Sequence, residues 1–416
     1  MRFVQTACRA EKIAKAGIPG RIVLGDGACP PEELAGKAQC VYLDPPFNTG
    51  DTFYLKQKIG EEGYRTGKKQ LTLTAFQDRF ASREEYQALL RRLIRAGRSL
   101  LNDTGAFFLH LDTREAPYAR MLCDEEFGEE NLVNEIVWAY QTGGRTLKHF
   151  SRKHDLILFY QKSRKLYFDI QSVPLSRTEN RSNHMKRHTD EDGRSYRTIR
   201  SGGKTYTYYD DAPVYPGDVW MDVSHLQQKD PQRTGYDTQK PVALLKRILA
   251  CTTRAGDLAV DLCCGSGTTL AAAADMDRRF LGMDCSPLAI ATARKRLTDA
   301  ALTVDWPFGA PGAELEAEVL PGVGFYDVHL LRYAPPGGER EGVPGLDALD
   351  QWAVGFIKEG VFLTQDLSCR SRRNPALNDV LLLPQLRGVP AILTIDVWGN
   401  RAVWVAEDGE TPRPDA

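Results

Sequence analysis

Apolar strand patterns alternate with helical patterns in the second half of the chain, and this alternation constrains the fold more than any other feature. The short apolar runs Leu258–Leu262 and Phe280–Met283 predict strands. Helical patterns follow them at Thr268–Asp275 and Leu288–Leu297, and another precedes them at Val242–Cys251. Strands that alternate with helices form a mostly parallel sheet. The sequence therefore predicts an α/β fold.

The first half of the chain predicts further elements of this kind. Apolar runs at Ile22–Leu24, Cys40–Leu43 and Ala106–Leu111 predict strands. Apolar residues recur at helical spacing over Arg83–Leu101, which predicts an amphipathic helix. The polar stretch Asn48–Asp78 predicts a long loop, and loops of that length are uncommon unless they are functional or disordered.

The composition is that of a globular protein with more than one domain. The chain has 416 residues, of which 42% are hydrophobic and 26% charged. No apolar run approaches the ~18–20 residues that a membrane-spanning helix requires, and the first 20 residues lack the apolar stretch of a signal peptide. We therefore expect a cytoplasmic protein without membrane contacts. The nine cysteines form no pair of C-x-x-C units, which argues against zinc and predicts no metal site.

The charge is unevenly distributed along the chain. The formal net charge is −1, but residues 141–209 carry 15 Lys and Arg against six Asp and Glu, a net of +9. Residues 311–416 carry nine Lys and Arg against 16 Asp and Glu, a net charge of −7. A basic segment that is also rich in Tyr, Thr, Ser and His predicts a nucleic-acid surface. The alternative is an ordinary solvated face.

A glycine-containing turn joins the strand at Leu258 to the next helix, in the stretch Asp261-Leu-Cys-Cys-Gly-Ser-Gly-Thr-Thr269. Glycine lacks Cβ, so the backbone there can turn tightly and approach a ligand. Asp284 closes the following strand, where an acid suits ribose hydroxyls. No Lys follows Gly267 as in a phosphate-binding loop, and Leu270 replaces the third glycine of a dinucleotide site. The pattern favours a nucleoside without phosphates, with a purely structural turn as the alternative.

A second motif, Asp44-Pro45-Pro46-Phe47, directly follows the strand Cys40–Leu43. The prolines fix φ and lack backbone donors, which leaves rigid carbonyl acceptors beside a carboxylate. This arrangement suits an amino group that donates two hydrogen bonds, and the aromatic ring offers a flat surface to a base. The alternative is that the prolines end the strand and the acid caps a turn.

These motifs in combination resemble those of amino-group DNA methyltransferases. Asp44–Phe47 is similar to their catalytic motif and Asp261–Thr269 to their S-adenosylmethionine motif, in the order of the β group. Leu24-Gly25-Asp26 and Thr238-Gln239-Lys240-Pro241 resemble two further elements of that group. Asp44–Gly50 is also similar to the modification subunits of type III restriction systems. The matches span residues 21 to about 297.

The resemblance implies a Rossmann-like, S-adenosylmethionine-dependent methyltransferase sheet with a circularly permuted motif order, an inserted target-recognition region and an additional C-terminal domain. We expect the catalytic half at residues 1–160, the target-recognition insertion at 161–215 and the cofactor-binding half at 216–305. Residues 306–416, which begin with a Pro- and Gly-rich stretch at Pro307–Gly312, are expected to form an accessory domain whose role the sequence does not indicate.

The implied activity is site-specific methylation of the N6 amino group of a flipped-out adenine in duplex DNA, as part of a restriction-modification system or derived from one. In this family Asp at the first motif position implies adenine, whereas N4-cytosine enzymes usually have Ser. Alternatives are an N4-cytosine methyltransferase, a modification subunit inactive without a partner chain, and an RNA or protein methyltransferase. Candidate partners besides duplex DNA are a second copy of the chain and a restriction endonuclease.

The resemblance also assigns roles to residues. Catalysis is expected from Asp44, Pro45, Pro46 and Phe47. Asp284 is expected at the ribose, Asp26 at the adenine end and Lys240 at the methionine carboxylate of the cofactor. The full set of expected S-adenosylmethionine contacts is Asp26, Gly27, Gln239, Lys240, Asp261, Cys263, Gly265, Ser266, Gly267, Thr268, Thr269 and Asp284. The expected DNA contacts are Arg145, Lys186, Arg187, Arg194, Arg197 and Lys204.

Overall fold

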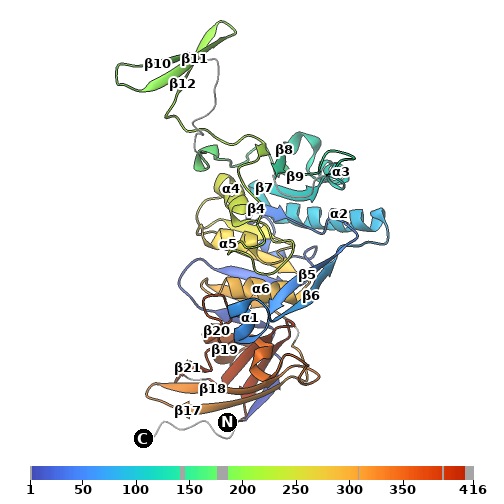
Figure 1. Cartoon of the computed structure of the whole chain (residues 1–416), viewed down its shortest axis with the longest axis vertical. Coiled ribbons are helices and arrows are strands. Elements are labelled where there is room, and N and C mark those ends of the chain that lie inside the picture. Colours follow the sequence, from blue (N-terminus) through green and yellow to red (C-terminus); the bar gives the residue numbers. More distant parts are fainter. Residues whose placement is uncertain (1, 141–145, 176–185, 308, 387, 408–416) are drawn as a thin grey trace.

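The computed structural model describes residues 2–140, 146–175, 186–307, 309–386 and 388–407. The molecule is elongated, with a small three-stranded sheet at one end and both chain termini near the other (Figure 1). The α-helices are α1 (Gly60–Thr66), α2 (Arg83–Leu100), α3 (Ala116–Phe127), α4 (Val242–Thr252), α5 (Thr268–Ala274) and α6 (Pro287–Arg296). Among the described residues, no helix combines the length and the apolar character needed to span a membrane.

One sheet of 15 strands forms the centre of the molecule, and its middle part is parallel. Six neighbouring strands run in the same direction. In sheet order they are β16 (Leu302–Asp305), β3 (Gly20–Leu24), β15 (Arg279–Asp284), β14 (Leu258–Asp261), β4 (Ala38–Leu43) and β7 (Leu101–Asp112). The predicted α/β fold is thereby confirmed. Beyond β7 the sheet continues through β9 (His154–Gln161), β8 (Leu132–Ala139) and β13 (Val219–Trp220).

The sheet also extends in the other direction, into the C-terminal region. There it continues through β2 (Ala10–Ile13), β20 (Val361–Cys369), β19 (Leu349–Lys358), β22 (Pro390–Asp396), β23 (Arg401–Ala406) and β1 (Phe3–Thr6). A second sheet lies beside these strands and consists of β17 (Glu314–Pro321), β18 (Phe325–Ala334) and β21 (Val380–Pro384). The first strand of the chain, β1, therefore pairs with the last, β23. Among the described residues, the first and last strands therefore belong to the same β structure.

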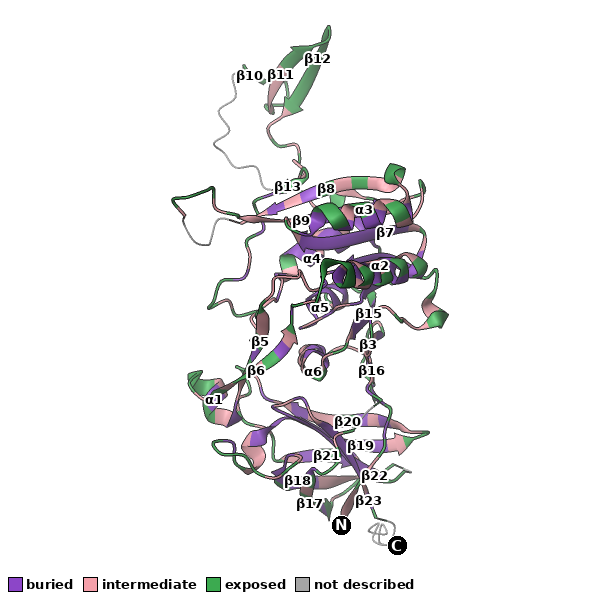
Figure 2. Cartoon of the chain, turned by 90° about the vertical axis from the view of Figure 1, so that its right-hand side faces the viewer, coloured by how far each residue is buried: buried purple, intermediate pink, exposed green. Residues whose placement is uncertain are grey.

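Helices cover both faces of the parallel strands. On β4 the side chains of Val41 and Leu43 pack with α2 and α3, while Cys40 and Tyr42 pack on the side of α4 to α6. Every residue of β4 is buried for this reason, and a strand buried on both faces reads as a continuous apolar run. Figure 2 shows the middle strands and α5 largely buried, whereas α2 and α3 carry exposed surface.

The predicted long loop at residues 48–78 is wrong. The segment forms the hairpin β5 (Thr52–Lys58) and β6 (Gln70–Gln77), with α1 between the two strands. Leu55 and Ala75 are buried in a small apolar cluster with Tyr236 and Ala289, while most of the other hairpin side chains are polar. Residues 70–75 alternate polar and apolar side chains, a strand signal that the loop prediction overlooked, whereas β5 shows no regular alternation.

Residues 161–215, expected to be the target-recognition insertion, contain a separate small sheet. It consists of β10 (Arg187–Thr189), β11 (Ser195–Ser201) and β12 (Lys204–Tyr209), which pair in antiparallel fashion. The sheet projects from the end of the molecule, and its surface is mostly exposed (Figures 1 and 2).

Candidate functional site

The two sequence motifs lie at the same edge of the sheet. Strands β4 and β14 are parallel neighbours, with Asp261 opposite Tyr42. The carboxyl ends of both strands therefore point the same way, and the segments that follow them meet. Asp44 and the turn at Gly265 line one cavity of about 400 Å³. The carboxyl end of an open α/β sheet is where such folds commonly bind ligands.

The turn after β14 depends on its glycines. Gly265 and Gly267 have φ of +49° and +76°, which side chains with a Cβ rarely adopt. A Cβ on Gly267 would also lie 2.9 Å from the Cβ of Ala293 in α6, so the residue allows α5 and α6 to pack closely. Gly27 plays a related part, because a Cβ there would lie 2.0 Å from the carbonyl oxygen of Leu262. Substitution at any of these positions would displace the cavity wall.

Two carboxylates, the buried Asp261 and the partly buried Asp284, hold the turn in place. Asp284 Oδ2 accepts a hydrogen bond from the Gly265 amide at 2.9 Å, and its Oδ1 accepts from the Ser286 amide at 2.9 Å. Asp261 accepts from the Thr269 hydroxyl at 2.5 Å and from the Cys263 amide at 3.0 Å. Burial raises the pKa of Asp284 and raises that of Asp261 to about 7.

The cavity lining carries an excess of carboxylates. Asp26, Asp44, Asp261 and Asp284 line it, and Lys240 is the one Lys or Arg among the described lining residues. Such a lining favours a cationic ligand and disfavours phosphate groups, because like charges repel strongly where water is partly excluded. This agrees with the preference for a nucleoside without phosphates.

Asp44 forms an ion pair with Lys240. The Lys240 Nζ lies 2.7 Å from Oδ1 and 2.6 Å from Oδ2 of Asp44, and both side chains are largely buried. The same ammonium lies 5.0 Å from the centre of the Phe47 ring. The structure thus brings Lys240 to the Asp-Pro-Pro-Phe motif, whereas the resemblance implied a contact with the cofactor's carboxylate.

The backbone after the prolines is held by contacts that the sequence did not predict. The buried carboxylate of Asp78 accepts from the amides of Phe47, Asn48 and Thr49 at 3.1, 2.7 and 3.0 Å. The Tyr86 hydroxyl donates to the Pro46 carbonyl at 2.7 Å. Three convergent amides form a concave anion-binding arrangement, and here a side chain of the same chain fills it. The backbone of the motif is therefore held by Asp78 through its amides and by Tyr86 through a carbonyl.

A buried polar chain lies behind the motif, and its members Tyr42, His110 and Tyr140 were not predicted. Tyr42 lines the cavity, and its hydroxyl contacts His110 Nδ1 at 2.7 Å. His110 Nε2 lies 3.3 Å from Asp155, which also accepts from the Tyr140 hydroxyl at 3.3 Å. The His110 ring packs against Phe47, with ring centres 5.9 Å apart. Isolated polar residues inside apolar strands gave no sequence signal for this chain of contacts.

The cavity collects nearly all of the residues expected at the cofactor. Eleven of the twelve line it, and Gly267 lies in the turn behind. The Gln239 side chain accepts from the Thr234 amide at 2.8 Å and donates to the Gln232 carbonyl at 2.7 Å, so it also fixes the preceding loop. Asp26 is half exposed and pairs with Arg92 at 2.5 Å. Residues that line the cavity but were not predicted include Phe76, Leu89, Leu93, Tyr236 and Cys285.

Four of the expected DNA contacts, Arg187, Arg194, Arg197 and Lys204, lie in the strands or the turn of the sheet β10–β12, which projects away from β4 and α5 (Figure 1). Arg187 and Arg197 pair with Asp210 at 3.0 and 3.2 Å, and Arg194 pairs with Asp211 at 2.9 Å. Lys186 and Lys204 are exposed, whereas Arg145 lies outside the described residues. Part of the positive charge of this sheet is therefore neutralised by Asp210 and Asp211.

Comparison with known proteins now identifies the family. The sequence model described as DNA methylase, for N6 and N4 enzymes, matches residues 38–295, more than half of the chain. The chain belongs to the N6/N4 DNA methylase family. The resemblance inferred from the two motifs is thereby confirmed at the family level.

The chain is similar to type II and type III modification enzymes. It is 24% identical over 306 residues to type II methyltransferase M.EcaI of Enterobacter cloacae, covering 62% of this chain and 64% of that protein. It is 25% identical over 279 residues to the DNA adenine methyltransferase YhdJ of Escherichia coli, covering 66% of this chain and 82% of that protein. It is 25% identical over 139 residues to the Mod subunit of the type III enzyme EcoP15I of Escherichia coli, covering 31% and 21%. The match thus spans less than two thirds of M.EcaI.

Solved structures of DNA modification methylases are also similar. The Thermus thermophilus protein TTHA0409, a DNA modification methylase complexed with S-adenosylmethionine, has a TM-score of 0.40 at 17% identity, covering 68% of this chain and 97% of that one. The PvuII cytosine-N4-specific DNA methyltransferase has a TM-score of 0.44 at 14% identity, covering 68% and 90%.

Proposed function

We propose that this protein is a site-specific DNA methyltransferase that transfers the methyl group of S-adenosylmethionine to the N6 amino group of a flipped-out adenine. The observation that carries the proposal is the shared cavity, because Asp44 and the turn at Gly265 line the same space. An amino group held by Asp44 would therefore meet a cofactor held by the turn. Enclosure of both reactants in one site replaces a bimolecular encounter by positioning.

The cavity lining fits S-adenosylmethionine. When bound, this cofactor supplies an activated methyl group on a positively charged sulfonium, and the carboxylate-rich lining favours such a cation. We assign Asp284 to the ribose hydroxyls, because its two oxygens each accept one amide and retain further lone pairs. Asp26, at the mouth of the cavity, is assigned to the adenine end. The remaining cavity residues of the predicted cofactor set shape the wall.

Asp44 and Pro45 are assigned to the target amine. Two acceptors, the Asp44 carboxylate and the Pro45 carbonyl, would each take one N–H and localise the nitrogen lone pair for attack. We assign Pro45 to this role because the motif resemblance implies it; Pro46, which lines the cavity, already accepts from the Tyr86 hydroxyl and retains one lone pair on its carbonyl. The proton that the nitrogen releases after transfer goes to Asp44 or to water. Lys240, which contacts both carboxylate oxygens, is assigned to orienting Asp44.

The base must leave the duplex to reach this cavity. Flipping costs a few kcal/mol, and stacking on Phe47 would return about 1–3 kcal/mol. Target recognition is assigned to the basic region at 161–215, including the sheet β10–β12. The proposal for adenine rests on the Asp at the first motif position and is supported by the similarity to a DNA adenine methyltransferase.

Methyl transfer by the purified chain tests the proposal. The chain is incubated with S-adenosylmethionine and mixed-sequence duplex DNA, and the digested nucleosides are analysed by mass spectrometry. N6-methyladenine supports the proposal, whereas N4-methylcytosine would overturn the choice of base. Asp44→Ala should abolish transfer and retain cofactor binding.

The type III Mod relative favours one alternative, a modification subunit that needs a partner chain. Transfer by the single chain, as a monomer or homodimer, would exclude it. Transfer that appears only after a companion endonuclease is added would establish it.

A further inference from the structure

A second cavity, of about 420 Å³, lies between the parallel sheet and the C-terminal region. Its walls come from β5 and α1, from the loop 231–234, from α6, and from the C-terminal residues Asp350, 371–373 and 396–399. Leu55 lines this cavity and packs in one apolar cluster with Tyr236, which lines the first cavity. The two cavities are therefore adjacent, although no described residue lines both of them.

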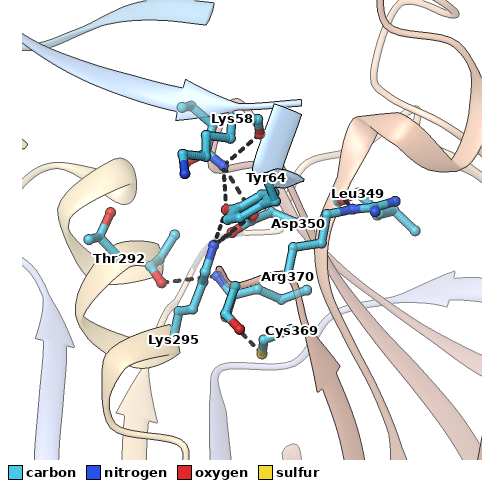
Figure 3. Close-up of polar contacts among 12 residues, drawn as sticks. Lys58, Tyr64, Thr292, Lys295, Leu349, Asp350, Cys369 and Arg370 are labelled. Carbon is cyan, nitrogen blue, oxygen red and sulfur yellow. Dashed lines mark hydrogen bonds and ion pairs between the residues drawn. The ribbon is translucent and has the colours of Figure 1, made fainter. Parts of the chain in front are cut away.

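The second cavity has the opposite charge to the first. Seven Lys and Arg side chains line it against two carboxylates, Asp350 and Asp396. Asp350 is fully engaged: it accepts from Lys295 Nζ with both oxygens at 2.8 Å, from the Tyr64 hydroxyl at 2.7 Å and from Gln57 Nε2 at 3.0 Å. Figure 3 shows Lys295 reaching Tyr64 and Asp350 from α6.

The second carboxylate, that of Asp396, accepts hydrogen bonds from residues of the loop that follows it. Asp396 accepts from the amides of Trp398 and Asn400 at 2.9 Å and from the Asn400 side chain at 2.8 Å. Burial raises its pKa, which favours the neutral form. Even with both carboxylates counted as charged, the seven Lys and Arg side chains that line the cavity exceed them by five.

Several cations in this cavity lack an acidic partner. Within the described part of the chain, no ion pair joins Lys58, Arg372 or Arg373 to a carboxylate. Burial lowers the pKa of Lys58, and the positive charges of Arg372 and Lys295 lower it further. Lys58 and Lys295 also lie 5.3 and 4.7 Å from the centre of the Tyr64 ring. Lys58 is partly buried and Arg372 and Arg373 are exposed, and a bound anion would stabilise these neighbouring positive charges.

We propose that this second cavity binds a small ligand that carries two or more phosphate groups, such as a nucleoside polyphosphate. Guanidinium and ammonium groups are the side chains that recognise phosphate. The volume falls in the range of small-ligand pockets, roughly 300–1,000 Å³, and Leu55, Leu288 and Tyr64 add apolar surface for a base or sugar. A concave site of this size suits a free phosphate ester better than the backbone of a duplex. The site is independent of the methyl-transfer proposal.

Calorimetric titration of the full chain with pyrophosphate and with ADP at low ionic strength tests this proposal. The double variant Lys58→Gln/Arg372→Gln removes two cavity cations. The double variant Lys68→Gln/Arg332→Gln removes the same charge from exposed positions outside the cavity and serves as the control. We expect the wild type and the control to bind, and the cavity variant to lose about tenfold or more in affinity, as expected when charge-assisted contacts are removed.

Melting temperatures and S-adenosylmethionine affinity, measured on all three proteins, check that the fold and the first cavity are intact. Equal pyrophosphate affinity of the cavity variant and the control would overturn the proposal, as would the absence of binding to the wild type. If the cavity variant weakens binding of duplex DNA but not of pyrophosphate or ADP, the site holds a DNA backbone and the proposal of a small ligand is wrong.

Discussion

Asp78 offers the sharpest test of how the Asp-Pro-Pro-Phe motif is positioned. Its carboxylate accepts three amides, from Phe47 and Thr49 on Oδ2 and from Asn48 on Oδ1. In Asp78→Asn one oxygen becomes an amino group, so at least one amide loses its acceptor and faces a donor. Hydrogen bonds to charged groups contribute about 1.5–3 kcal/mol each. We therefore expect the free energy of unfolding to fall by about 2–3 kcal/mol.

The catalytic consequence should exceed the structural one. The three amides follow Pro46 directly, so their release loosens Phe47, and misplacement by about 1 Å can cost up to 100-fold in rate. We expect kcat for methyl transfer to fall at least about tenfold, with cofactor affinity little changed because the Asp261 and Asp284 contacts remain. Urea titration and single-turnover transfer assays measure the two effects. Asp51→Asn, at an exposed position in the same segment, is the matched control. Wild-type kcat in Asp78→Asn would refute the argument.

Three further predictions concern the cavity and the projecting sheet. Asp284→Ala should weaken S-adenosylmethionine binding about tenfold or more, as loss of a charged acceptor implies, while kcat at saturating cofactor changes less; equilibrium dialysis measures the affinity. Because the pKa of buried Asp261 is raised to about 7, its charge destabilises the fold increasingly as pH rises from about 4 to about 7. Asp261→Asn should therefore gain about 2 kcal/mol relative to wild type between pH 5 and pH 8, measured by urea titration, and a difference that does not change with pH would contradict this. Lys186→Gln/Lys204→Gln should weaken DNA binding and lower the salt slope by about 2, whereas removal of the Asp210-paired Arg197 should change the slope less.

Much of the fold could be predicted because local signals and burial agree. The continuous apolar run of β4 predicted a strand that is buried on both faces. At the start of α2 the Ser82 hydroxyl accepts from the Glu85 amide at 3.2 Å, a local contact that Ser and Glu at this spacing favour. The hairpin of β22 and β23 turns at Gly399, which has φ of +82°. In each case a short stretch of sequence determines the conformation.

The parts that could not be predicted depend on contacts between distant residues. Lys240 and Asp44 are 196 residues apart, and the pairing of β1 with β23 joins the two ends of the chain. In the hairpin at 52–77, β6 carries a local alternation, whereas β5 lacks one and buries Leu55 against the distant Tyr236. The hydrogen bond between Tyr42 and His110 joins two strands whose sequences are otherwise apolar. No local pattern encodes such partners.

The central claim is that one cavity holds both the cofactor and the target amine. A crystal structure of the chain with S-adenosylhomocysteine and a short duplex containing the methylated site tests it most directly. The account predicts the ribose at Asp284, the thioether sulfur facing Asp44, and a flipped base whose amino group contacts the Asp44 carboxylate and the Pro45 carbonyl. A ligand bound away from the Gly265 turn, or a base held by other residues, would contradict it.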